Sequence, residues 1–419
     1  MAPETGDRLN LSRLPLRPLD EALAELLSQA QPLGPPEQIS SFDADGRVLA
    51  RDLVSELSVP GHDNSAMDGY ALRCADVSAP GVVLRVTQRI AAGSTGRPLG
   101  VGEAARIFTG APVPEGADAV VMQEHCERPD GTEDRVLVQR PPKPGQWIRR
   151  AGEDVAKGCV VLSAGTRLGP AELGLAASIG YASLTVGPRP RVALFSTGDE
   201  LVMPGSVAVA DLPPGAIYNS NRYFLRALLL RLGCQVTDLG VVPDRLDATL
   251  QALQQATRAH DLVLTSGGVS VGEEDHIKPA VSQLGELHLW QIAIKPGKPF
   301  AYGKLGTTHF IGLPGNPVSS FVTFLLLVRP FLLRLQGASD LAVPRLPMKA
   351  GFHWDRAEAR REFLRVRFGA DGRLELFANQ SSGVLTSTVW GDGLVDNPPG
   401  RSVAPGDEVQ FIPFASLLS

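Results

Sequence analysis

The sequence contains few cysteines, no surplus of positive charge and no long apolar run. Its four cysteines, Cys74, Cys126, Cys159 and Cys234, are far apart and form no Cys-x-x-Cys pair, which argues against a disulfide framework or a zinc site and favours a reducing compartment. The formal net charge of −5 argues against a general nucleic-acid-binding protein. The longest apolar run, 324–328, is broken by Arg-Pro, so no membrane-spanning segment is expected.

The N-terminal residues and the overall composition indicate a soluble protein with several domains. Residues 1–13 are polar and contain no apolar core, so we expect no secretory signal and a cytoplasmic location. The 419 residues are 43% apolar and 20% charged, which is typical of globular proteins. A chain of this length exceeds what one hydrophobic core usually organises, and two to four domains are expected.

Strand-like and helix-like segments alternate between residues 187 and 337. This pattern predicts a parallel sheet that is covered on both faces by helices, with ligands bound at the carboxyl ends of the strands. Expected strands are 192–195, 235–242, 262–265, 288–294, 299–302 and 310–312, and expected helices are 222–232, 246–259, 276–284 and 318–335. Ser220 or Asn221 is the expected cap of the first of these helices, and a separate helix is expected near the N-terminus over 19–29.

Short strand-like runs separated by Gly and Pro occur on both sides of this region. They predict a small β domain over residues 55–145, inserted into an N-terminal linking domain made of residues 1–54 and 146–186. A second small β domain is expected over residues 338–419, with strands at 349–354, 363–368, 374–377 and 408–413. The predicted fold class is therefore α/β and β multidomain: a parallel α/β domain over 187–337, an inserted β domain, a linking domain and a C-terminal β domain.

Two glycine loops and a doubled lysine are concentrated in residues 261–317. Ser-Gly-Gly at 266–268 and Gly-Leu-Pro-Gly-Asn-Pro at 312–317 each follow an apolar run, and Lys295 and Lys298 share a Lys-Pro-Gly-Lys turn. Glycine lets backbone N–H groups approach a ligand, and helix N-termini favour anions. One such loop alone could be a plain turn, but its recurrence at a second strand end predicts a pocket for a phosphate-bearing or oxyanionic ligand.

Two common nucleotide-binding motifs are absent from these loops. Neither loop is followed by the Gly-Lys-Ser/Thr of a Walker motif, and neither matches Gly-x-Gly-x-x-Gly. A standard nucleoside triphosphatase or dinucleotide oxidoreductase is therefore disfavoured.

Carboxylates follow three of the expected strands and should approach the same edge of the sheet. They are Glu200 in Ser-Thr-Gly-Asp-Glu, Asp244 and Asp275. Each alone is most often a solvated surface residue. Three of them beside an anionic ligand would repel it, and a bridging divalent cation such as Mg²⁺ is the economical explanation, because Mg²⁺ prefers oxygen ligands and phosphate.

Two polar segments precede the α/β region. Residues 63–70, Asp-Asn-Ser-Ala-Met-Asp-Gly-Tyr, fit a structural turn and a functional loop about equally. Residues 108–114, Phe-Thr-Gly-Ala-Pro-Val-Pro, form a turn by their prolines, and a binding role for Thr109 rests on little by itself.

Taken in order, these motifs resemble the molybdopterin molybdenumtransferases, the MoeA family that includes the E domain of gephyrin. The resemblance covers about residues 18–415. Its six blocks are 63–71, 108–114, 196–201, 265–272, 295–300 and 313–317.

The resemblance implies an enzyme that inserts molybdate at the dithiolene sulfurs of adenylylated molybdopterin and releases AMP. It also implies a need for Mg²⁺ or a similar cation, and an elongated homodimer whose site combines the α/β domain of one subunit with the inserted β domain of the other. Carried over by position, the catalytic residues are Asp63, Thr109, Glu200, Asp244 and Asp275, of which Glu200, Asp244 and Asp275 also hold the metal. Lys295, Lys298, Arg365 and Ser382 are implied to bind molybdate, and Ser266, Gly267, Gly268, Gly315, Asn316 and Pro317 the pterin-bearing substrate.

One departure and two alternatives stand beside this interpretation. Some relatives carry a lysine four residues before the Lys-Pro-Gly-Lys turn, where this sequence has Gln291. A single-domain molybdopterin adenylyltransferase would resemble residues 189–335 only, and such an enzyme is also a candidate partner. A scaffold protein that organises other partners is the alternative from a different class. Partners in the form of nucleic acid or membrane are not expected.

Overall fold

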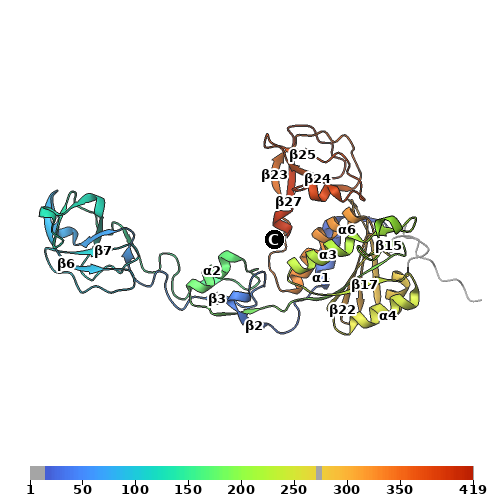
Figure 1. Ribbon diagram of the computed structural model, residues 1–419, viewed down its shortest axis with the longest axis horizontal. Coiled ribbons are helices and arrows are strands. Elements are labelled where there is room, and N and C mark those ends of the chain that lie inside the picture. The colour runs from blue at the N-terminus through green and yellow to red at the C-terminus, as the bar shows by residue number, and fades with distance from the viewer. Residues whose placement is uncertain (1–14, 270–275, 419) are drawn as a thin grey trace, which may run out of the picture.

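The computed structural model describes residues 15–269 and 276–418. The molecule is elongated (Figure 1): the α/β domain and the C-terminal domain lie at one end, the inserted β domain lies at the other, and a slender linking unit joins them. The site residues predicted in the α/β domain and in the inserted β domain are therefore far apart within one chain.

A seven-stranded sheet forms the centre of the α/β domain. Its strand order is β1-β19-β21-β22-β18-β14-β17. β17, β14, β18 and β22 are parallel neighbours, as predicted, and their carboxyl ends lie at one edge. The strands are β1 (Leu16–Arg17), β14 (Arg191–Thr197), β17 (Gln235–Val242), β18 (Leu262–Ser266), β19 (Glu286–Ile292), β21 (Pro299–Leu305) and β22 (Thr308–Leu313).

The sheet is mixed, which corrects the prediction of a fully parallel sheet. β21 runs antiparallel to both β19 and β22. Leu305 pairs with Thr308, so only two residues connect β21 to β22, and the first of them, Gly306, has a φ of +64°. Antiparallel strands can be joined by such a hairpin, whereas a parallel pair needs a crossover of a dozen or more residues.

Helices cover both faces of this sheet. α1, α3 and the central helix, Pro317–Leu335, pack on one face, and α4 and α5 pack on the other. The central helix consists of α6 (Pro317–Thr323), a π turn (Phe324–Val328) and α7 (Arg329–Leu335). The other helices are α1 (Leu19–Gln29), α3 (Ser220–Arg231), α4 (Leu246–Thr257) and α5 (Ile277–Leu284).

The central helix is the most apolar helix of the described chain. By length and composition it alone among the described helices could cross a membrane, but 94% of its apolar window is buried inside the protein, as in a core helix. Pro330 lacks the amide hydrogen that would bond to the carbonyl of Leu326, and the helix widens into the π turn just before this position.

The first helix belongs to the α/β domain and not to the linking unit. β1 pairs with β19, and Leu19, Ala22 and Leu26 of α1 are buried in the same core as the central helix. This placement differs from the predicted boundary, which assigned residues 1–54 to the linking domain. The apolar face of α1 needs a large apolar surface, and the linking unit with its two-stranded sheets offers little.

The linking unit and the inserted domain are connected by two chain segments that run side by side. β2 (Glu37–Ser40) pairs with β13 (Ser183–Val186), and β3 (Leu53–Val54) pairs with β12 (Val160–Leu162), beside α2 (Pro170–Ser178). Further out, β4 (Asn64–Ser65) pairs with β11 (Ile148–Arg149). The chain therefore leaves and returns at one place, which confirms the predicted insertion.

The inserted domain is a six-stranded sheet with the order β8-β5-β7-β6-β10-β9. Its helical segments in the described chain are short 3₁₀ turns, as the Gly- and Pro-rich sequence predicts. The strands are β5 (Gly69–Leu72), β6 (Val82–Ile90), β7 (Glu103–Ile107), β8 (Ala119–Met122), β9 (Cys126–Glu127) and β10 (Arg135–Val138).

The C-terminal domain is a second β domain that shares a strand with the α/β domain. β20 (Ile294–Lys295), which directly precedes the Pro-Gly-Lys turn, pairs with β24 of the C-terminal sheet. The predicted strand at 349–354 is displaced to β23, and β26 was not predicted because its buried Asp396 and Asn397 interrupt the apolar pattern. The elements are β23 (Leu346–Lys349), β24 (Arg361–Phe368), β25 (Leu374–Leu376), β26 (Gly393–Asn397), β27 (Glu408–Pro413), α8 (Thr386–Trp390) and α9 (Ala415–Leu418).

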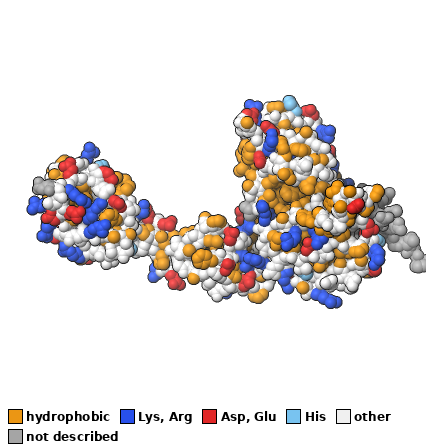
Figure 2. All heavy atoms as spheres, in the orientation of Figure 1, with side chains coloured by type: hydrophobic (Ala, Val, Ile, Leu, Met, Phe, Trp, Pro, Cys, Tyr) orange, Lys and Arg blue, Asp and Glu red, His pale blue; other side chains and the backbone are white. Residues whose placement is uncertain are grey.

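Hydrophobic side chains gather where the C-terminal domain meets the α/β domain (Figure 2). A groove of about 530 Å³ with largely apolar walls lies between α3, the central helix and α8. Tyr223 and Val389 on its rim are 53% and 85% exposed, so the apolar surface extends to solvent.

His309 on β22 links the stability of the α/β core to pH. Its side chain is 8% exposed and its Nδ1 lies 2.9 Å from the Tyr302 hydroxyl. Burial lowers the pKa of His309 from 6.5 to about 4. Between these values the unfolded chain binds a proton that the folded chain does not, so stability is complete above pH 6.5 and is lost as the pH falls toward 4.

We therefore expect the free energy of unfolding to decrease by at most ~1.4 kcal/mol per pH unit over this interval because of His309. Calorimetric unfolding midpoints of the wild type and His309→Gln at pH 7, 6 and 5 measure this dependence, and the variant should lose less stability on acidification. His288→Gln, which removes a half-exposed histidine of β19, serves as the control. Equal slopes for the wild type and His309→Gln would contradict the assignment.

Candidate active site

A cavity of about 680 Å³ opens at the carboxyl ends of β14, β18 and β22. It brings together most of the residues predicted in the α/β domain. The predicted residues that line it are Glu200, Asp244, Ser266, Gly267, Gly268, Gly315, Asn316 and Pro317.

The two glycine loops are in direct contact with each other. Gly267 and Gly268 have φ values of +94° and +67°, and a Cβ on Gly268 would lie 2.5 Å from Ile277 Cγ1. A Cβ on Gly315 would meet only the Gly267 Cα, at 3.9 Å. Asn221 holds the loops together because its Nδ2 donates to Ser266 Oγ and to the Gly315 carbonyl, both at 2.7 Å. The floor of the cavity is therefore backbone, fixed by one amide side chain.

One wall of the cavity is suited to the oxygens of an anionic group. α3 and the central helix both begin at its wall, and helix N-termini carry partial positive charge. Ser196 Oγ and Asn219 Nδ2 are buried in the same wall and have no hydrogen-bond partner among the described residues. Unpaired buried polar atoms are costly, so these two groups are suited to a ligand's oxygens.

Asn219 and Asn221 were not predicted as site residues. Sequence reasoning gave Ser220 or Asn221 as the cap of this helix, whereas the cap is Asn219, whose Oδ1 accepts a hydrogen bond from the Arg222 amide. The signal that could have identified them is their position: α3 is the first α-helix after β14, and it begins at the sheet edge where β14 ends.

Two of the three predicted metal ligands line the cavity. Glu200 follows β14 and folds back over its own turn, because a Cβ on Gly198 (φ +142°) would lie 2.5 Å from Glu200 Oε2. Asp244 follows β17, and its amide donates to Asp199 Oδ1 at 3.3 Å. Asp275 lies outside the described residues. The described residues contain no cluster of three or more His, Cys, Asp or Glu side chains that could hold a metal.

The predicted residues of the inserted domain lie far from this cavity (Figure 1). Asp63 accepts hydrogen bonds from the Ala151 amide at 2.9 Å and from Arg150 Nη1 at 2.6 Å, and these bonds lower the pKa of Asp63. Thr109 donates through its amide and its hydroxyl to Asp68 Oδ1, both at 2.8 Å, which lowers the pKa of Asp68. A single chain does not bring these residues to the cavity.

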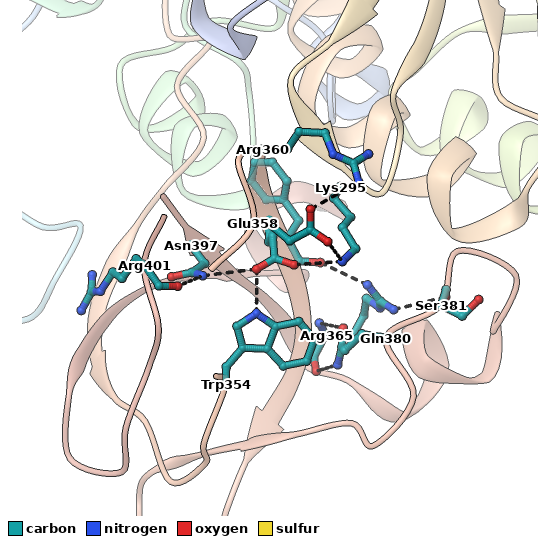
Figure 3. A network of polar contacts seen from close by, with 11 residues as sticks. Lys295, Trp354, Glu358, Arg360, Arg365, Gln380, Ser381, Asn397 and Arg401 are labelled. Atoms are coloured by element: carbon teal, nitrogen blue, oxygen red, sulfur yellow. Dashed lines mark hydrogen bonds and ion pairs between the residues drawn. The ribbon is translucent and has the colours of Figure 1, made fainter. Parts of the chain in front are cut away.

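The Lys-Pro-Gly-Lys turn crosses from the α/β domain to the C-terminal domain. Lys295 Nζ lies 2.6 Å from Glu358 and 3.3 Å from Glu362 (Figure 3), whereas Lys298 is exposed. A Cβ on Gly297 would lie 2.4 Å from Thr323 Oγ1, so the turn packs closely against the central helix. The two lysines therefore have different surroundings, although the sequence analysis gave both the same role.

Ser382 lies in a loop at one side of the cavity, and Arg365 on β24 donates a hydrogen bond to that loop. Arg365 is 1% exposed and donates to Ser387 Oγ and to the carbonyls of Phe363 and Ser381, and burial lowers its pKa to about 10. The Ser382 carbonyl accepts from the Val318 amide at 3.0 Å. The next residue of this loop, Gly383, lines the cavity. Direct anion binding by Arg365 and Ser382 stays a prediction.

Three family models match the chain in the order of its domains. The MoeA N-terminal region (domain I and II) matches residues 17–180, the "Probable molybdopterin binding domain" matches 193–334, and the MoeA C-terminal region (domain IV) matches 347–414. The outer two matches extend well beyond the α/β domain and argue against the single-domain alternative. Together the matches define a multidomain protein with a molybdopterin-binding domain of this type at its centre.

Individual relatives agree with these matches over nearly the whole chain. The molybdopterin molybdenumtransferase of Haemophilus influenzae is 39% identical over 96% of this chain and 99% of its own length. Molybdopterin molybdenumtransferase 2 of Mycobacterium tuberculosis is 36% identical over 93% of this chain and 96% of its own. The crystal structure of the molybdopterin biosynthesis moeA protein from Pyrococcus horikoshii superimposes with a TM-score of 0.82 at 30% identity, and covers 95% of this chain and 100% of its own. The chain belongs to the MoeA family.

The positive φ of Gly268 provides a test of the cavity floor. We expect Gly268→Ala to lower the free energy of unfolding by about 1–3 kcal/mol, because the new Cβ meets Ile277 in a backbone conformation that alanine rarely adopts. Gly315→Ala adds the same atom to the facing loop with only an ordinary contact, and its cost should be smaller. Thermal unfolding of the two variants checks this order, and the reverse order would contradict the described geometry.

Proposed function

We propose that this chain is a molybdenum insertase of molybdenum cofactor biosynthesis. Its substrates are adenylylated molybdopterin and molybdate, and its reaction places molybdenum on the dithiolene sulfurs and releases AMP. The observation that carries the proposal is the cavity between the two glycine loops, which joins helix N-termini, unpaired buried polar atoms and two carboxylates.

The cavity suits the adenylate part of this substrate. The N-termini of α3 and of the central helix stabilise phosphate charge, and they do so most as the phosphoanhydride breaks and AMP leaves. Ser196 and Asn219 supply hydrogen-bond donors from the wall, and the backbone of the Ser-Gly-Gly loop allows close approach. We therefore expect the phosphate-bearing end of the substrate to lie at the sheet edge.

The carboxylates Glu200 and Asp244 fit a divalent cation shared with the substrate. Mg²⁺ is commonly held by one or two carboxylates together with substrate phosphates, and both residues offer oxygen donors only. Glu200 and Asp244 would hold the cation, and it would offset the negative charge of the phosphates beside them.

A homodimer explains how Asp63 and Thr109 take part. The inserted domain lies at the far end of the molecule from its own cavity, so a site that combines both needs a second chain (Figure 1). A twofold arrangement places the same two surfaces in contact twice, so one dimer contains two such composite sites. Arg150 and Asp68 then keep Asp63 and Thr109 in place beside β4 and β11, where the inserted domain joins the linking unit.

The first prediction of this proposal concerns turnover. The purified protein should release AMP from adenylylated molybdopterin when molybdate and Mg²⁺ are present, and Glu200→Gln and Asp244→Asn should each reduce kcat by about 10²-fold or more. Asp247→Asn, which changes an exposed aspartate on α4, is the matched control and should retain activity. An active Asp244→Asn enzyme would remove this residue from the site.

A second prediction tests the shared site. Asp63→Asn and Asp244→Asn chains carrying different affinity tags are co-expressed, and the heterodimer is purified through both tags. Each homodimer should be inactive, whereas the heterodimer should recover about half of the wild-type activity, because one of its two composite sites is intact. An inactive heterodimer would show that Asp63 and Asp244 act within one chain.

A further inference from the structure

Lys295 is engaged by two carboxylates at the junction between the α/β and C-terminal domains (Figure 3). Its ammonium lies 2.6 Å from Glu358 Oε1 and 3.3 Å from Glu362 Oε1. While both contacts persist, Lys295 attracts an oxyanion only weakly, because the two carboxylates already neutralise its positive charge. The proposed role of Lys295 in molybdate binding therefore requires that one carboxylate gives way.

Glu362 is the fixed carboxylate of the pair. It lies on β24, its side chain is 1% exposed, and its Oε2 accepts hydrogen bonds from Trp354 Nε1 at 2.6 Å and Asn397 Nδ2 at 3.5 Å. Moving this group would leave a buried charge and two donors unpaired, which is costly. Glu362 therefore anchors the ammonium of Lys295.

Glu358 is the carboxylate that can move. It lies in the irregular segment before β24, and its side chain is 31% exposed. Its second oxygen lies 3.6 Å from Arg360 Nη2, so a cation remains beside it when it leaves Lys295. The hydrogen bond from Lys295 lowers the pKa of Glu358, and the carboxylate is charged at neutral pH. Solvent reaches Glu358 and not Glu362, so an anion that approaches Lys295 meets Glu358 first.

We propose that Glu358 is a stand-in anion: it occupies Lys295 in the molybdate-free enzyme and exchanges for the incoming tetrahedral oxyanion. This inference rests on the proposed function of Lys295. It means that Glu358 sets the affinity of the enzyme for molybdate. Exchange conserves the number of ionic contacts at Lys295, so the lysine is never left with Glu362 alone. A weakly binding monoanion gains little binding free energy when it replaces Glu358, whereas a dianion gains more.

The first test measures molybdate binding by titration calorimetry on the full-length protein without pterin substrate. Glu358→Gln keeps the size of the side chain and removes its charge, and it should bind molybdate about 5-fold more tightly, the effect of removing a competing partly exposed ion pair. The gain should shrink at high ionic strength, where such contacts are screened. Glu375→Gln breaks an ion pair with Arg367 elsewhere in the same sheet and is the matched control, with unchanged affinity expected.

A second measurement connects the gain to Lys295. In a Lys295→Ala background, Glu358→Gln should no longer change molybdate affinity, because the two residues act through one contact. In turnover assays, Glu358→Gln should lower the KM for molybdate with little change in kcat. Equal affinity of the wild type and Glu358→Gln, or a gain that persists without Lys295, would overturn the inference.

The outcomes also separate this inference from the proposed function itself. If the wild type binds no molybdate and releases no AMP, the insertase proposal fails. If the wild type binds molybdate and turns over while Glu358→Gln binds no more tightly, only the stand-in role of Glu358 fails.

Discussion

The parallel alignment of β14, β18 and β22 is the constraint on which the site depends. Because these strands are in register, the turns that follow them reach the same edge, where the Ser-Gly-Gly loop touches the loop at Gly315. Asn221 then locks both loops with two hydrogen bonds of 2.7 Å. The two helix N-termini, the carboxylates and the unpaired buried atoms all take their positions from this edge, so the suitability of one cavity wall for an anionic group follows from strand direction.

Much of this arrangement could be predicted from the sequence. Apolar periodicity gave α1 and β17 with their observed ends, and the glycine loops identified the cavity because glycine is needed where φ is positive and neighbours are close. The reversal of β21 was missed because a two-residue turn at Gly306 carries little pattern. β26 was missed because polar residues such as Asp396 and Asn397 are rarely buried in a strand. Their burial is possible only because residues from other parts of the chain pair with them.

The environment of the two lysines could not be predicted from the sequence. Lys295 and Lys298 differ by three positions and share one turn, yet one is paired and the other is exposed. The difference arises from Glu358 and Glu362, more than sixty residues away, through a strand pairing between domains. Pairwise contacts of this range depend on the complete fold, and no local motif encodes them. The same holds for Arg365, whose donors are directed at the protein's own oxygens.

The short strand β20 ties the segment around Lys295 to two domains. It hydrogen-bonds to β24 on one side, while the glycine that follows it is pressed against Thr323 of the central helix on the other. The position of Lys295 is therefore fixed by contacts with both the α/β domain and the C-terminal domain. Glu362 lies on β24, the strand that pairs with β20, and Glu358 lies in the segment before β24, so both carboxylates reach the lysine from the C-terminal domain. The packing of one domain against the other therefore sets the charge that a small ion encounters beside Lys295.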